Sequence, residues 1–159
     1  MLAKNLSWLC LTFLWTLLDQ STKYLVWKTE GFSLTPFLDI IKVYNRGFVF
    51  GFFGGNSGVL KDIFYYAIPT AVLISVVYVL IKSEDRFTKF SLSLIAGGGL
   101  GNLIDRVFWG KVRDFIDFHI GSWHYPTFNI ADIFISVGIF LITLRLLTEE
   151  MGKLKRFKN

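Results

Sequence analysis

The chain has 159 residues, which is enough for one domain. It is 53% hydrophobic, contains 17 phenylalanines and has a mean hydropathy of +0.50, so it is too apolar for an ordinary soluble domain. The formal net charge is +5, but no basic run is interleaved with stacking aromatic residues, so we expect membrane lipid and no nucleic acid as a partner. The single cysteine, Cys10, excludes a disulfide framework within the chain.

Four segments are long and apolar enough to form membrane-spanning helices, each of which takes about 20 residues. They lie at about residues 6–27, 63–81, 90–109 and 129–147. We therefore expect an all-α membrane protein with four transmembrane helices in a single membrane-embedded domain, residues 1–159. The first segment continues without a small-residue cleavage site, so we expect a retained helix and no cleaved signal sequence.

The basic residues predict the orientation of these helices, because lysine and arginine are concentrated in cytoplasmic loops. The two sides carry nearly equal numbers, but the dense cluster at Lys153–Lys158 is typical of a cytoplasmic end. We expect both termini to lie inside the cell. The segments at about residues 28–60 and 110–127 then face outward, and both are apolar enough to lie on the bilayer surface.

Local patterns in the two outer segments are distinct. The run Ile40–Tyr44 is β-branched and aromatic, which is typical of a strand. The stretch "GFFGGNSG" at residues 51–58 is a glycine-rich turn region. In the second segment, Trp123, His124 and Tyr125 fit the aromatic belt of a membrane interface.

Ionisable side chains inside the predicted helices need an explanation, because each costs about 2.5–3.5 kcal/mol at the centre of a membrane helix. Asp19 and Lys23 lie four residues apart on one face of the first helix. They are either a mutually neutralising pair or the support of a polar site. In the third helix, Gly97 and Gly101 have the GxxxG spacing that permits close helix packing.

Further polar side chains gather at the outer ends of the third and fourth helices. Asn102, Asp105 and Arg106 share one face of the third helix, where the Asp–Arg pair is either structural or snorkels to the interface. Asn129 and Asp132 occupy the first turn of the fourth helix, where helix capping is the alternative to a functional role.

Asp114, in the segment after the third helix, maps to the same outer rim of the bundle, and this coincidence predicts a shared polar centre. Two neighbouring carboxylates do not both ionise easily, so one keeps a proton. The ionised carboxylate can then activate water while the protonated one polarises a peptide carbonyl. A pair of aspartates at this rim would suit this chemistry, which needs neither a metal nor a nucleophilic side chain.

Two other chemistries fit the sequence less well. Serine–lysine peptidase chemistry would use Ser21 and Lys23, which point to different faces of a helix. A zinc site would have to draw on a loop that lacks the HExxH pattern. Its candidate ligands would be Asp114, Asp117, His119 and His124.

Five motifs carry a resemblance to a known family. They are "DQSTK", "NRGFVFG", "GNLIDR", "VRDFID" and "FNIAD", and they occur in this order between Asp19 and Gly138. In these motifs the sequence resembles the lipoprotein signal peptidases (signal peptidase II) of bacteria. The resemblance implies an aspartic endopeptidase of the inner membrane with its active site at the outer face. It implies removal of the signal peptide from diacylglyceryl-modified prolipoproteins by cleavage before the lipidated cysteine.

The resemblance also implies roles for particular residues. Asp114 and Asp132 match the catalytic pair, and the outer segment after the first helix is similar to the family's small extracytoplasmic β cradle. We expect no cofactor or metal, and a monomer. The residues that match the family's site-supporting or substrate-binding positions are Asp19, Lys23, Asn45, Asn102, Asp105, Arg106 and Asn129.

The sequence departs from the family pattern at two places. Phe48 and Val49 stand where the family commonly has small residues, and Arg113 stands where it commonly has an apolar one. If the Arg113 guanidinium points inward, we expect it to lower the affinity of Asp114 for its proton. The rival functions are a small transporter or channel subunit with a polar relay, and a non-catalytic scaffold. Charges gathered at one rim argue against the transporter or channel subunit, and two aspartates that converge from separate segments argue against the scaffold.

Overall fold

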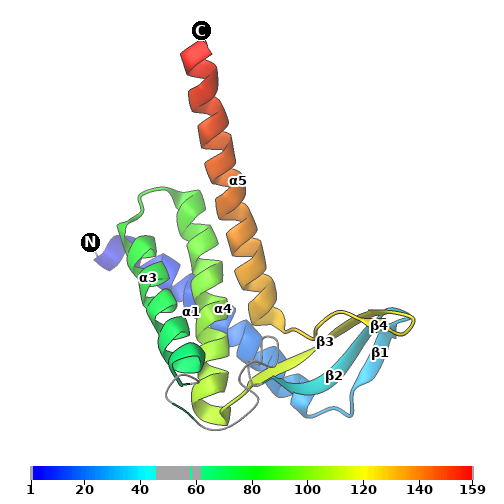
Figure 1. Cartoon of the computed structure of the whole chain (residues 1–159). Coiled ribbons are helices and arrows are strands. Elements are labelled where there is room, and N and C mark those ends of the chain that lie inside the picture. Colours follow the sequence, from blue (N-terminus) through cyan, green and yellow to red (C-terminus); the bar gives the residue numbers. More distant parts are fainter. Residues whose placement is uncertain (1, 46–57, 59–61, 159) are drawn as a thin grey trace.

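The computed structural model describes residues 2–45, 58 and 62–158, and this part of the chain is mostly helical with one small antiparallel sheet (Figure 1). The predicted glycine-rich turn, except Gly58, and the departures at Phe48 and Val49 lie outside these residues. The helices are α1 (Leu2–Trp27), the short π-helix η1 (Ile63–Ala67), α3 (Ile68–Lys82), α4 (Arg86–Trp109) and α5 (Ile130–Lys158). The strands are β1 (Phe32–Thr35), β2 (Leu38–Asn45), β3 (Val112–Ile120) and β4 (Trp123–His124).

Helix α4 lies at the centre of the bundle and contacts α1, α3 and α5. Its glycines permit this, as the GxxxG spacing predicts. A Cβ atom on Gly97 would lie 2.8 Å from the main-chain oxygen of Thr12 in α1. A Cβ on Gly98 would overlap the main-chain oxygen of Ala131 in α5. Small residues therefore bring the backbones of three helices together.

Within the described residues, two helical stretches meet the length and composition of a membrane span, namely Ile63–Lys82 and Ile130–Lys153. The other two predicted spans, now α1 and α4, are helices of 26 and 24 residues that carry buried polar side chains. Their outward-facing side chains are nevertheless large and apolar. Those of α1 include Phe13, Leu14, Leu17, Leu18 and Leu25.

Three helix boundaries differ from the sequence-based expectation, and the first is the start of α1, which lies at Leu2 and not at about residue 6. Helix α4 begins at Arg86 because Asp85 caps it, accepting a hydrogen bond from the Thr88 main-chain N–H at 2.8 Å. Helix α5 continues to Lys158, well beyond the expected end at residue 147. Apolarity limits a membrane span but not a helix, and the polar extension is held by pairs such as Arg145–Glu149 at 2.9 Å.

The strands form one sheet in the order β1-β2-β3-β4 with antiparallel neighbours. The strand predicted at Ile40–Tyr44 is confirmed within β2, while β3 arises from a segment for which the sequence analysis named no strand. Figure 1 shows the sheet projecting from the end of the bundle where α5 begins, with both ends of the chain at the opposite end. The small antiparallel sheet fits the expected β cradle.

We predict that replacing Gly98 by alanine destabilises the protein by about 1–3 kcal/mol, because the new methyl group meets a main-chain oxygen that cannot rotate away. The control is Gly99→Ala, whose methyl would meet only Leu73 Cδ1 at 3.6 Å. Alanine there gains up to about 1 kcal/mol of helix propensity. Thermal unfolding in detergent measures both variants, and equal midpoints for the two would contradict the packing argument.

Candidate active site

Asp114 is held in β3 by the register of the sheet. It lies opposite Val43 of β2, and Asn45, two residues further along β2, donates from Nδ2 to Asp114 Oδ2 at 3.0 Å. On its other side, β3 pairs with Phe128, whose main-chain oxygen accepts from both Phe115 and Ile116 at 3.0 and 2.9 Å. This backbone pairing brings the start of α5 next to Asp114.

Asn129 links the two aspartates. Its Nδ2 donates to Asp114 Oδ1 at 2.6 Å, and its Oδ1 accepts from the Asp132 main-chain N–H at 3.1 Å. The Asn129 main-chain N–H in turn donates to Asp132 Oδ2 at 3.1 Å. This reciprocal arrangement is a capping box. Capping and site formation, which the sequence leaves as alternatives, are therefore both present in the same residues.

Asp132 is also held from α4. Asn102 donates from Nδ2 to Asp132 Oδ1 at 2.8 Å, and its Oδ1 accepts from Lys23 Nζ and from Asn129 Nδ2, both at 3.0 Å. Asn102 cannot rotate its amide without losing these bonds. Asp132 is half-buried while Asp114 is 2% exposed, so the two carboxylates occupy unlike environments.

Behind these residues lies a buried cluster of four charges, Asp19, Lys23, Asp105 and Arg113. Lys23 Nζ lies 2.9 Å from Asp19 Oδ2 and 3.2 Å from Asp105 Oδ2. Arg113 Nη2 lies 2.7 Å from Asp105 Oδ1. Two carboxylates and two cations balance, which reduces the cost of burying them. The Asp19–Lys23 pair is thus both mutually neutralising and joined to the site.

Burial raises the pKa of Asp114 to about 6, and the nearby charge of Asp132 adds to the increase. The hydrogen bonds from Asn45 and Asn129 act in the opposite direction, because they stabilise the carboxylate. The conditional expectation that Arg113 lowers the affinity of Asp114 for its proton stays a prediction, because the net increase comes from burial and does not exclude an opposing effect of this cation. The Arg113 guanidinium does point inward, but it is paired with Asp105.

An apolar cavity of about 290 Å³ opens beside Asp132, between α3, α4 and α5. Its polar lining comes from Asn102 and Arg106 of α4 and from Asp132 of α5. The cavity can hold an apolar chain next to a carboxylate. The remaining lining residues are Pro69, Val72, Leu73, Val76, Ile95, Gly99, Ile135 and Ile139.

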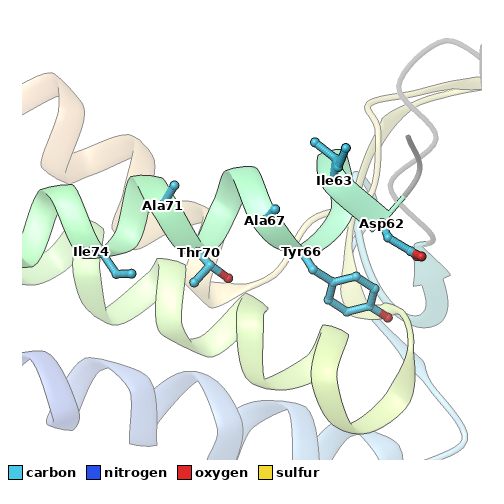
Figure 2. A pocket seen from close by; sticks show the side chains of 7 residues that line it. All are labelled: Asp62, Ile63, Tyr66, Ala67, Thr70, Ala71 and Ile74. Atoms are coloured by element: carbon cyan, nitrogen blue, oxygen red, sulfur yellow. The ribbon is translucent and has the colours of Figure 1, made fainter. Parts of the chain in front are cut away.

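Arg106 stands apart from the four-charge cluster. Its guanidinium carbon lies 5.3 Å from the centre of the Tyr65 ring, and its Nε has no hydrogen-bond partner among the residues that the structure describes. Tyr66 projects toward α4, and its hydroxyl donates to the main-chain oxygen of Arg106 at 3.4 Å. Figure 2 shows Tyr66 in a second, shallow hollow of about 540 Å³, whose lining includes neither Asp114 nor Asp132. That hollow runs along η1 and α3 and is lined by Asp62, Ile63, Tyr66, Ala67, Thr70, Ala71 and Ile74.

The two histidines considered for zinc lie beside separate carboxylates. His124 Nδ1 lies 2.9 Å from Asp117 Oδ2, and His119 Nε2 lies 3.3 Å from Asp39 Oδ2. Among the described residues, no three His, Cys, Asp or Glu side chains are placed to hold a metal ion. Sequence reasoning missed Gln20, which donates from Nε2 to both Asp19 Oδ2 and Asp105 Oδ1 at 3.1 Å. Its place beside Asp19 in "DQSTK" was the available signal.

Comparison with known proteins gives consistent results. The family model described as Signal peptidase (SPase) II matches residues 11–148. The lipoprotein signal peptidase of Blochmanniella pennsylvanica is 43% identical over 148 residues, which is 89% of each chain. That of Burkholderia mallei is 41% identical over 140 residues, 85% of this chain and 84% of that one. A solved bacterial membrane enzyme, determined by the in meso method, matches with a TM-score of 0.77 at 35% identity, covering 92% of this chain and 91% of that one.

We predict that Asn45→Ala moves the protonation of Asp114 to higher pH, because the carboxylate loses a donor that stabilises its charge. Infrared difference spectroscopy measures this through the carbonyl band of the protonated acid, which is assigned by its loss in Asp114→Asn. Ser33→Ala in the exposed strand β1 is the control and should titrate like the wild type. An unchanged midpoint in Asn45→Ala would contradict the assigned hydrogen bond.

Proposed function

The chain belongs to the signal peptidase II family, and we propose that it is an aspartic endopeptidase that removes the signal peptide from diacylglyceryl-modified prolipoproteins, cutting before the lipidated cysteine. The observation that carries the aspartic mechanism is the linkage of Asp114 and Asp132 through one asparagine. Asn129 bonds to Asp114 at 2.6 Å and to Asp132 at 3.1 Å. Asn129 thereby holds the two carboxylates near each other, and neighbouring carboxylates can share one proton directly or through a water molecule.

In this mechanism Asp114 carries the shared proton and Asp132 carries the negative charge. The burial of Asp114 and its raised pKa support the first assignment. The lesser burial of Asp132 supports the second, because a carboxylate closer to water keeps its charge more easily. Asp132 also borders the cavity, where a water molecule and a peptide can approach it.

The reaction then follows general acid–base chemistry. The Asp132 carboxylate takes a proton from water, and the water oxygen attacks the scissile carbonyl carbon while Asp114 gives its proton to the carbonyl oxygen. When the carbon–nitrogen bond breaks, the proton on Asp132 passes to the departing amine. A hydroxyl of the tetrahedral intermediate returns a proton to Asp114, so both carboxyl groups regain their starting states.

We place this site at the outer face of the bacterial inner membrane. In this arrangement four helices span the membrane as a single domain and both termini lie in the cytoplasm. The apolar outward faces of α1 and α4 support spans by these helices although they bury polar groups. The location of the sheet, opposite both chain ends, supports the orientation (Figure 1). The cavity between α3, α4 and α5 is suited to an apolar part of the substrate. The site lies within one chain, which supports a monomer.

We predict that Asp114→Asn and Asp132→Asn each lower the rate of signal-peptide cleavage by about 10²- to 10⁴-fold, because an amide can neither share the proton nor accept one from water. The assay uses purified protein and a diacylated prolipoprotein. Asp117→Asn is the matched control, since Asp117 lies on the same strand but pairs with His124. It should cleave like the wild type. Normal turnover by either of the first two variants would refute the aspartic mechanism.

We also predict that the diacylglyceryl group is needed for efficient cleavage. Each buried CH₂ of an acyl chain contributes about 0.8 kcal/mol to membrane binding, so two chains hold the cysteine strongly at the bilayer. This tether would supply part of the orientation of the scissile bond at the aspartates. Single-turnover kinetics with one prolipoprotein, with and without the lipid, measures the effect. Equal rates would remove the reason for a site at the membrane edge.

A further inference from the structure

Arg113 directly precedes Asp114 and is 6% exposed. Asp105 of α4 holds it at three points. Arg113 donates to Asp105 Oδ1 from Nη2 at 2.7 Å and from Nε at 3.2 Å, and its main-chain N–H donates to Asp105 Oδ2 at 2.9 Å. The carboxylate therefore fixes both the side chain and the backbone of the residue next to Asp114.

Gln20 extends this contact to α1. Its Oε1 accepts from Arg113 Nη2 at 2.8 Å, and its Nε2 donates to Asp105 Oδ1 at 3.1 Å and to the Gly101 main-chain oxygen at 3.0 Å. The guanidinium also lies near two aromatic rings, 5.2 Å from the centre of Trp109 and 5.8 Å from that of Trp27. The start of β3 is thus tied to both α1 and α4.

The Arg113 side chain does not enter the cavity beside Asp132. Successive residues of a strand point to opposite faces, so Arg113 and Asp114 point apart. Arg113 and Gln20 line a separate groove on the side of α1 and α4, together with Tyr24 and Trp109. Neither is among the described residues that line the cavity beside Asp132. An effect of Arg113 on cleavage would therefore pass through other residues.

We infer that Arg113 is a positioning residue for the peptidase reaction. Its guanidinium attaches the start of β3 to α1 and α4 and neutralises the charge of Asp105. The attachment of β3 in turn keeps Asp114 in contact with Asn45 and Asn129. This inference rests on the proposed aspartic mechanism. Loss of the guanidinium removes the side-chain bonds to Asp105 and Gln20, which loosens the start of β3, and leaves one more negative charge near the two aspartates. That charge favours the protonated forms of the pair, so the pH dependence of cleavage moves upward. A lysine at this position keeps the positive charge but cannot donate from two nitrogens to Asp105 as the guanidinium does.

The test measures kcat, KM and the pH optimum of prolipoprotein cleavage for Arg113→Met and Arg113→Lys. We expect Arg113→Met to lower kcat by about 10- to 100-fold with KM unchanged. Its pH optimum should rise by about 0.5–1 unit. Arg113→Lys should lose severalfold in kcat and keep the wild-type pH optimum. The control is Lys111→Met, which removes a nearby cation that lies 3.4 Å from the Tyr44 ring centre, and it should match the wild type.

Wild-type kcat in Arg113→Met, or a reduced kcat with an unmoved pH optimum, would overturn the inference. If Arg113→Met does not fold, Arg113→Lys decides alone, and wild-type kcat in that variant overturns the inference. The parent proposal is judged separately by the wild type and Asp114→Asn. If the wild type cleaves and Asp114→Asn does not, the aspartic mechanism stands whatever the Arg113 variants show.

Discussion

The buried ammonium group of Lys23 is the interaction on which the rest of the site depends. It lies within 3.2 Å of Asp19, Asp105 and Asn102, so it joins α1 to α4 and reaches Asp132 through the Asn102 amide. A buried charge is tolerated only when it is closely paired, and removing one partner leaves an uncompensated charge. Loss of one of these groups is therefore expected to disturb the others. The positions of Asp114 and Asp132 depend in this way on the neutral four-charge cluster behind them.

Burial in this chain follows an inverted pattern. The Asp19 and Lys23 side chains of α1 are buried inside the protein, whereas its Phe13 and Leu17 side chains are exposed. In water this would expose an extensive apolar surface, whereas in lipid the same surface is solvated. The close approach of helices at Gly97 and Gly98 then supplies the packing that lipid does not drive. The polar cluster and the glycines are complementary, since one specifies which helices meet and the other lets them meet closely.

Much of this arrangement is predictable from local sequence. The length of the apolar segments led to the four helices, and the gathering of polar residues at one rim, together with the order of five motifs, led to the paired aspartates. The partners of Arg113 were not predictable, because the pairing depends on how β3 docks on α4, a contact set by tertiary structure. The extension of α5 to Lys158 was missed because hydropathy predicts only the apolar span of a helix, and the helix itself can continue into polar sequence. Gln20 was missed because its place beside Asp19 was the only local signal, and its bonds to Asp105 and Arg113 depend on tertiary structure.

The pairing of Phe128 with β3 closes the chain into a loop. The strand leaves the site after Asp114, turns at the exposed Gly121, and returns through bonds from Tyr125 to Phe118 and from Phe128 to Ile116. The spacing between the two aspartates is thus set by the pairing of Phe128 with β3 and does not depend on the length of the segment between them. The turn near Gly121 is accordingly a place where a short peptide insertion, such as an epitope or a fluorophore acceptor, would label the sheet side of the protein without altering the separation of the carboxyl groups.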